Sequence, residues 1–284
     1  MAGSLSNSWT LVKESARVLK MDKELMVFPL LSGIATLMVT ATFVAPLFLT
    51  GGWEIFGSEG GDTSYAGVVV GFLFYLAQYT VIFFFNAALV GAALIRMDGG
   101  DPTVSDGLGI AVSRMPTILG YAAIAATVGM VLRFISERSG FLGRLAVGLV
   151  GMGWTLATYL TVPVLVTRDL GPIDAVKESA GLFRKTWGEQ VVGNFGMGWA
   201  FFLMGVSWTL VSVGGLVAFA SLMPSVSPPL VIAWLGVIVL GYVFLALFSS
   251  ALNGVYTAAL YRYASTGESG IFDESIVGHA FRHR

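Results

Sequence analysis

The chain has 284 residues, of which 56% are apolar and only 12% are charged, and it contains 36 glycines and no cysteine. A soluble globular domain carries about 25% charged residues, so this composition indicates an integral membrane protein. The formal net charge of −1 argues against a nucleic-acid-binding protein, which needs a concentrated basic face. Without cysteine, disulfides and thiolate chemistry are excluded.

The chain begins with a predicted amphipathic helix. In "WTLVKESARVLK", apolar residues recur at three- and four-residue spacing, which places them along one stripe: Trp9, Val12, Ala16 and Leu19. Basic residues accompany this stripe: Lys13, Arg17 and Lys20. The apolar run that follows from Val27 is long enough to span a bilayer, so the start does not have the pattern of a cleavable signal peptide.

Six apolar runs reach the length of about 20 residues that a membrane-spanning helix needs. Each must be helical, because lipid offers no hydrogen-bond partner to an open strand. The predicted spans are Val27 to Thr50, Ala66 to Ile95, Thr117 to Ile135, Leu142 to Thr167, Val191 to Leu222 and Leu230 to Tyr263.

The phrase "VKESA" returns before the fifth span, in a second predicted amphipathic helix that opens at Pro172. Its stripe repeats the first one and consists of Ile173, Val176, Ala180 and Phe183, and Lys177 and Arg184 lie along its flank. A fainter copy, "PTVSDGLGIAVSRMP", precedes the third span, with Asp101 as predicted N-cap. Its stripe is Val104, Leu108, Ala111 and Met115.

We therefore predict an all-α polytopic membrane helix bundle. It has six transmembrane helices in three hairpins, each preceded by a cytoplasmic amphipathic helix. Residues 1–263 form a single integral membrane domain, with pseudo-repeats at about 5–97, 98–168 and 169–263, and residues 264–284 form a cytoplasmic tail.

The distribution of Lys and Arg predicts the orientation. The loops after the first, third and fifth spans, together with the adjoining span ends, contain three of the 16 basic residues: Arg133, Arg138 and Arg144. Because basic residues accumulate on the cytoplasmic side, both termini are expected to be cytoplasmic.

Polar side chains inside the spans allow two interpretations. Gln78 and Asn86 lie in the second span and Asn253 lies in the sixth. They either form hydrogen bonds between helices or line a polar path.

No catalytic or metal-binding pattern is found. The two histidines, His279 and His283, lie in the last six residues, and the sequence has no HExxH, GxSxG or P-loop motif. The centres of the spans contain no ionisable residue, whereas pumps and proton-coupled transporters usually have one there. We expect no enzymatic activity, no cofactor and no metal.

Three stretches, "SWTLVKESARVLKMDKELMVFPLLSG", "PTVSDGL" and "FDESIVGHAFRHR", resemble an uncharacterised family of prokaryotic polytopic membrane proteins. The resemblance implies a location in the prokaryotic plasma (inner) membrane, and it brings no activity. A more distant similarity is to the membrane domains that accompany glycerophosphodiester phosphodiesterases. The catalytic domain of those proteins is absent here.

Two functional hypotheses follow. In the first, the protein is a non-enzymatic scaffold or accessory protein that binds lipids, another membrane protein or a second copy of itself. Its surface would consist of Trp9, Lys13, Arg17, Lys20, Lys177 and Arg184. In the second, it is a passive channel or transporter for a small solute, ion or lipid, with a path lined by Gln78, Asn86 and Asn253.

Overall fold

The computed structural model describes residues 16–56, 64–185, 187–222 and 228–266. Within these ranges every regular element is a helix. In chain order they are the end of a first helix at residues 16–21, η1 (Lys23–Met26), α2 (Val27–Thr50), η2 (Gly52–Phe56), α3 (Tyr65–Met97), α4 (Val104–Ser113), α5 (Met115–Arg138), α6 (Phe141–Ala157), α7 (Thr161–Thr167), α8 (Pro172–Lys185), α9 (Trp187–Leu222) and α10 (Pro228–Thr266).

Six helical stretches in the described residues are long and apolar enough to cross a membrane: Lys23–Thr50, Tyr65–Met97, Met115–Arg138, Phe141–Thr167, Gly198–Val217 and Pro229–Thr266. This confirms the prediction of an all-α chain with six helices that could span a membrane. The observed helices overlap all six predicted apolar runs.

The fourth predicted span is interrupted, and a serine from another helix fills the break. Residues 158–160 separate α6 from α7. Pro163 contributes to the interruption, because it has no backbone N–H to donate to the carbonyl group four residues earlier. The Ser179 hydroxyl of α8 donates to the Ala157 carbonyl at 2.7 Å and accepts from the Leu160 N–H at 3.0 Å. The break therefore keeps its hydrogen bonds and holds α8 in place.

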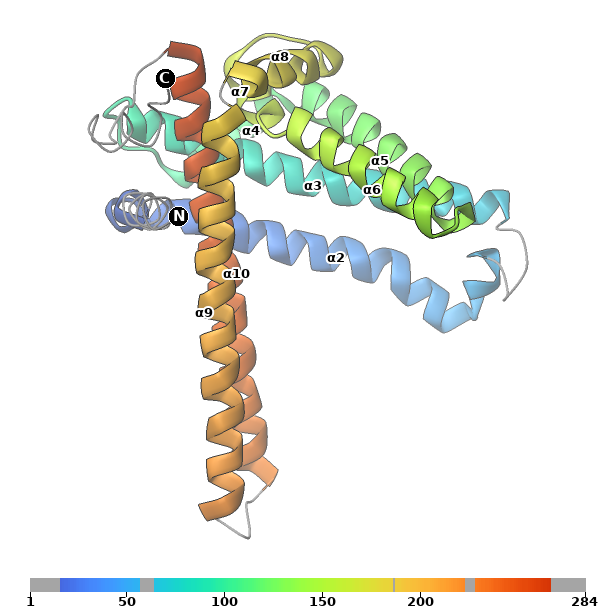
Figure 1. Cartoon of the computed structure of the whole chain (residues 1–284), viewed down its shortest axis with the longest axis vertical. Helices are drawn as coiled ribbons and strands as arrows, with labels where there is room; N and C mark the ends of the chain where they lie inside the picture. The colour runs from blue at the N-terminus through green and yellow to red at the C-terminus, as the bar shows by residue number, and fades with distance from the viewer. Residues whose placement is uncertain (1–15, 57–63, 186, 223–227, 267–284) are drawn as a thin grey trace.

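Two groups of long helices leave one end of the molecule in different directions. In Figure 1, α2, α3, α5 and α6 run across the view, whereas α9 and α10 run down it. Both groups meet where α4, α7, α8 and the C-terminal part of α10 gather. The two groups do not run parallel to each other, and the bundle of three hairpins, each preceded by a cytoplasmic amphipathic helix, stays a prediction from the sequence.

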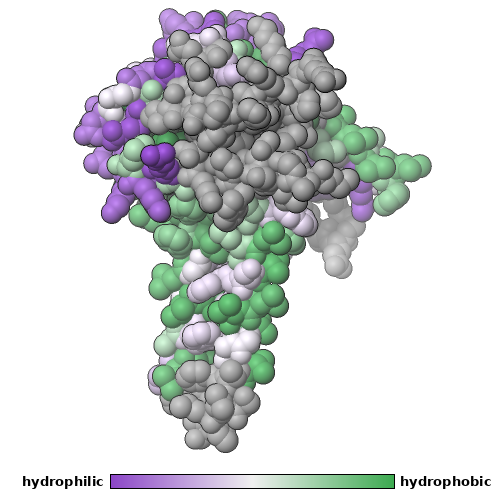
Figure 2. Space-filling model, turned by 60° about the vertical axis from the view of Figure 1, so that its left-hand side comes forward, coloured by the Kyte–Doolittle hydropathy of each residue, from purple (hydrophilic) through white to green (hydrophobic). Residues whose placement is uncertain are grey.

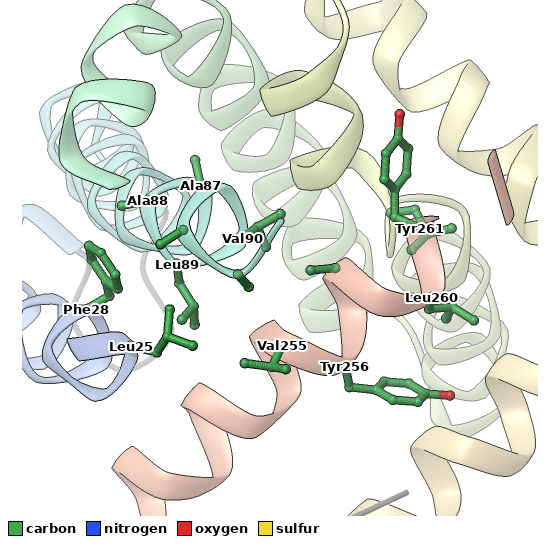
Figure 3. Packing of buried hydrophobic residues seen from close by; sticks show 14 of the residues in the cluster. Leu25, Phe28, Ala87, Ala88, Leu89, Val90, Val255, Tyr256, Leu260 and Tyr261 are labelled. Atoms are coloured by element: carbon green, nitrogen blue, oxygen red, sulfur yellow. The ribbon is translucent and has the colours of Figure 1, made fainter. Parts of the chain in front are cut away.

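The largest buried cluster lies where these groups meet. Figure 3 shows Leu25 and Phe28 beside Leu89 of α3, with Val255 of α10 facing them. Small residues of α3 bring its neighbours close, because membrane helices associate where side chains let backbones approach. A Cβ atom added to Gly107 of α4 would lie 2.7 Å from the Ala88 carbonyl oxygen of α3.

The α9–α10 pair is held by two reciprocal contacts between a tryptophan and a glycine. The ring of Trp208 packs against Gly241, and the ring of Trp234 packs against Gly215. A Cβ atom added to either glycine would collide with the ring that covers it. Each indole N–H also donates to a carbonyl of the other helix, at 3.3 Å for Trp208 to Ile238 and 3.2 Å for Trp234 to Ser212.

Candidate functional site

Hydrophilic residues gather at one end of the molecule. In Figure 2 they lie above the green, hydrophobic α9–α10 pair. We call this end the polar end, and it comprises the described parts of residues 16–26, 96–114, 167–185 and 255–266.

The end of the first helix presents charge outwards and apolar side chains inwards. Val18 and Leu19 are each only 2% exposed, within the main buried cluster. Arg17 and Lys20 of the same turns are exposed. Trp9 and Lys13, which belong to the same predicted surface, lie outside the described residues.

Helix α8 shows the same division. Ala175, Ser179 and Leu182 are buried, as is Phe183, while Lys177 and Arg184 are exposed. Lys177 also forms an ion pair with Asp174 at 3.0 Å.

The predicted stripe of α8 was wrong at its first position, since Ile173 is 61% exposed. Two residues along a helix correspond to about 200° of rotation, so with Ala175 buried, Ile173 must face the opposite side. The rotation of α8 is set by Ser179 in the break after α6, a contact that sequence spacing does not reveal.

Helix α4 begins with a cap that differs from the predicted one. Thr103, and not Asp101, caps the helix: its hydroxyl accepts from the Asp106 N–H, and the Asp106 carboxylate accepts from the Thr103 N–H at 2.9 Å. Hydrogen bonds from the backbone and hydroxyl of Thr103 lower the pKa of Asp106. Of the predicted stripe, Ala111 is buried and Val104 and Leu108 pack on the core, whereas Met115 is 40% exposed.

Ion pairs connect the helices of the polar end. Arg96 at the end of α3 bonds to Asp22 at 3.1 Å and to Asp101 at 2.5 Å. Asp22 is 4% exposed, and the ion pair gives this buried carboxylate a hydrogen-bond partner. Further pairs join Arg262 to Asp98 at 2.6 Å and Arg114 to Asp169 at 2.8 Å.

Arg168, just after α7, also connects helices of the polar end. Its guanidinium donates to the Tyr261 hydroxyl of α10 at 3.5 Å and lies 3.6 Å from Glu178 of α8. The hydrogen bond to Tyr261, with charge interactions from Tyr261 and Glu178, raises the pKa of Arg168. Arg96, Arg168 and Arg262 stand at the ends of the second, fourth and sixth spans, a regularity that could have predicted these links.

Two of the three predicted path residues form hydrogen bonds to other segments of the chain. Gln78 donates to the Thr40 hydroxyl of α2 at 2.7 Å, and Asn253 accepts from the Tyr159 hydroxyl at 3.2 Å. Asn86 is half-buried on α3, two turns from Gln78, or about 12 Å along the axis. Gln78 and Asn253 each join a different pair of segments, as interhelical hydrogen bonds do.

Among the described residues, no group of three or more His, Cys, Asp or Glu side chains could hold a metal ion.

Residues 65–272 match the family of unknown function DUF6159, which covers more than half of the chain. The chain belongs to this family. No curated protein and no solved structure matches it. The family carries no assigned activity, and the similarity to glycerophosphodiester phosphodiesterase-associated domains is not among the matches.

Proposed function

We propose that this member of the family is a non-enzymatic protein of the prokaryotic plasma membrane that binds anionic lipid headgroups through its cytoplasmic helices. In this proposal the polar end faces the cytoplasm, both termini lie there, and the six apolar helices span the membrane as three hairpins. The three helices that precede these hairpins are repeats of one unit.

One observation carries the proposal. At the described end of the first helix Val18 and Leu19 are buried while Arg17 and Lys20 are exposed. On α8 the apolar side chains other than Ile173 lie against the protein, while Lys177 and Arg184 are exposed. Because most of the described apolar side chains on these helices are covered by protein, attraction between charges supplies most of the proposed binding. A Lys or Arg near an anionic surface contributes about 1 kcal/mol, so the four described cations together contribute about 4 kcal/mol. The pair with Asp174 reduces the share of Lys177.

The test replaces Arg17, Lys20, Lys177 and Arg184 together by Gln in the full chain. Native mass spectrometry then measures how much phosphatidylglycerol remains bound after purification, at low and high salt. We expect the variant to retain several-fold less lipid and to lose most of its salt dependence, since exposed charges are screened over about 8 Å at physiological salt.

A matched pair of single variants controls for overall charge. Arg184→Gln removes a cation from α8, and Arg144→Gln removes an exposed cation near the opposite ends of the spans. The first should reduce bound phosphatidylglycerol and the second should not. Unchanged lipid occupancy in the quadruple variant would refute the lipid-binding function.

A channel or transporter is the less favoured of the two functions, because Gln78 and Asn253 form hydrogen bonds with other segments of the chain. Flux of ions or small solutes into vesicles that contain the purified protein, abolished by Asn253→Leu, would reverse this order.

A further inference from the structure

A pocket of about 220 Å³ lies far from the polar end, between the N-terminal part of α3 and the C-terminal part of α5. Gly71 and Tyr75 line it from α3, and Arg133, Phe134 and Glu137 line it from α5. The ion-paired Arg96 marks the other end of α3, so this pocket is separate from the cationic surface proposed above.

The pocket places a positive group beside a negative one. Arg133 Nε donates to Glu137 Oε1 at 2.7 Å, and its Nη1 donates to the Tyr75 hydroxyl at 3.0 Å. A guanidinium has five N–H donors, so these two bonds leave three for a ligand. The second carboxylate oxygen of Glu137 and the O–H of Tyr75 add an acceptor and a donor. Both charged side chains are more than half exposed, so a ligand can reach them.

The surroundings of this charged pair are open and largely apolar, with a further cation, Arg138, whose guanidinium lies 3.4 Å from the centroid of the Phe134 ring. On α5, Val131, Phe134 and Ile135 are 51%, 53% and 46% exposed, and on α3 Val69 is 56% exposed. Arg133 lies five residues before the end of α5, which is roughly 7.5 Å along the axis. A charged pair at such a depth, among exposed apolar side chains, is typical of the border between lipid tails and headgroups.

Beyond Tyr75, stacked aromatic rings follow α3 from the pocket towards the buried core. The ring of Tyr75 stacks on Tyr79, Tyr79 on Phe83 and Phe83 on Tyr121, with centroids 6.2, 5.6 and 4.4 Å apart. Tyr121 is 4% exposed. This geometry favours a site where a molecule binds from the lipid side over one that it passes through.

We propose that this pocket binds a zwitterionic headgroup, in which a phosphate diester stands next to a primary ammonium group, as in phosphatidylethanolamine. Arg133 and the Tyr75 hydroxyl hold the phosphate, and Glu137 accepts from the ammonium. Pockets for drug-sized ligands have volumes of about 300–1,000 Å³, so this smaller one takes the headgroup and leaves the acyl chains outside, against Val69 and Phe134.

The test uses the full chain, stripped of lipid and then exposed to an equimolar mixture of phosphatidylethanolamine, phosphatidylglycerol and phosphatidylcholine. Native mass spectrometry reports the ratio of bound lipids. We expect phosphatidylethanolamine to dominate once Arg17, Lys20, Lys177 and Arg184 are replaced by Gln, so that phosphatidylglycerol at the polar end no longer contributes. At the pocket, phosphatidylglycerol has no cation for Glu137, and the quaternary ammonium of phosphatidylcholine has no N–H to donate. Equal binding of the three lipids by this quadruple variant would overturn the proposal.

Three variants examine the parts of the site. Glu137→Gln should remove the preference for phosphatidylethanolamine over phosphatidylglycerol, and Arg133→Gln should lower phosphatidylethanolamine binding roughly tenfold, the effect of losing charge-assisted hydrogen bonds. Gly71→Leu should fill the pocket, since Gly71 lines it and a Cβ added there meets no atom within 4 Å. The lipid ratio is measured within one sample, so it does not depend on how much protein folds.

The controls are Arg144→Gln and Gly148→Leu, which change an exposed cation and an unobstructed glycine of α6. Both should keep the lipid ratio of the unchanged protein. If Arg133→Gln and Gly71→Leu also keep it, the pocket is not the binding site.

A final competition experiment distinguishes a membrane lipid from a soluble molecule as the natural ligand. Glycerophosphoethanolamine carries the phosphate diester and the primary ammonium without acyl chains. Competition by it at concentrations similar to those of the lipid would support the site and assign it to a soluble ligand. Failure to compete, with the lipid preference intact, would support the site and assign it to a membrane lipid. The quadruple variant separates the two proposals if it loses phosphatidylglycerol binding and keeps the preference of the pocket for phosphatidylethanolamine.

Discussion

The two halves of α10 lie in contrasting environments. Its C-terminal part contributes Ala251, Leu252 and Val255 to the buried cluster at the polar end, all fully covered. Its N-terminal part, together with α9, exposes large apolar side chains, among them Ile232 at 68% and Leu240 at 68%. One continuous helix thus passes from a protein core to a surface that lipid would cover.

The two regions are also held together by different means. The polar end combines buried apolar contacts, close helix approach at Gly107 and ion pairs such as Asp22 with Arg96. The described part of the α9–α10 pair is joined by interlocked tryptophans and glycines and by the 2.6 Å hydrogen bond between Thr209 and Tyr242. Lipid is as apolar as a leucine side chain, so helices immersed in it gain from shape and polar contacts more than from apolar burial. The polar end should therefore dominate the stability of the protein.

The largest effect is expected from Gly107→Ala, at the contact of α4 with α3. The added methyl group would meet the Ala88 carbonyl and the Phe28 ring, and we expect a loss of about 3 kcal/mol, at the upper end for overpacking. Thermal unfolding in detergent measures it. Gly109→Ala on the same helix meets no atom within 4 Å and should gain about 0.5–1 kcal/mol from helix propensity. Equal effects of the two variants would show that α4 does not pack as described.

The next largest effect on stability is expected at the two carboxylates that form ion pairs with Arg96. Asp22→Ala removes the buried partner and should cost about 2 kcal/mol, because a buried charged hydrogen bond is lost. Asp101→Ala removes a partner that is 91% exposed and should cost less than about 1 kcal/mol. The comparison uses the same unfolding measurement, and the reverse order would contradict the burial of Asp22.

A smaller effect is expected in the α9–α10 pair. Trp208→Phe keeps an aromatic ring over Gly241 but loses the indole hydrogen bond to Ile238, so we expect a loss of about 1 kcal/mol. Trp199→Phe, on a side chain that is 45% exposed and stacks on Phe202 of its own helix, serves as control. If Trp208→Phe costs more than Asp22→Ala, the polar end is not the more stabilising region.

The smallest effect depends on pH and concerns the cap of α4. The folded protein lowers the pKa of Asp106 below its ordinary value of 3.8, so the charged carboxylate stabilises the fold above that value. This contribution is lost as the pH falls through the lowered pKa, where the carboxylate takes up a proton. Asp106→Asn should therefore unfold slightly more easily at neutral pH, and the difference should shrink in acid. A difference that grows on acidification would contradict the capping arrangement.

Much of the fold follows from patterns along the sequence. The six long apolar helices follow from hydrophobic runs of sufficient length, and the helix at Pro172 begins where proline and the apolar spacing predict. Both patterns are local, so one stretch of sequence contains all the information that they need.

The remaining features depend on contacts between distant residues. The rotation of α8 depends on Ser179 meeting the break after α6, and the position of Asp22 depends on Arg96, which is 74 residues away. The pocket depends on Tyr75 meeting Arg133, 58 residues later. Spacing within one helix cannot reveal such pairs, and for this reason the sequence pointed to Gln78 and Asn253 and missed Arg133 and Glu137.

The orientation of the helices in the membrane is the central claim, and accessibility of single cysteines tests it most directly. The chain has no native cysteine, so each introduced thiol is the only one present. Ser105→Cys and Ser265→Cys mark exposed positions at the polar end, and Tyr65→Cys and Gly140→Cys mark exposed positions near the opposite ends of the spans. An impermeant thiol reagent added to intact cells should label Tyr65→Cys and Gly140→Cys, and should reach the other two only after the cells are opened. Labelling of Ser105→Cys and Gly140→Cys from the same side would contradict six crossings with a cytoplasmic polar end.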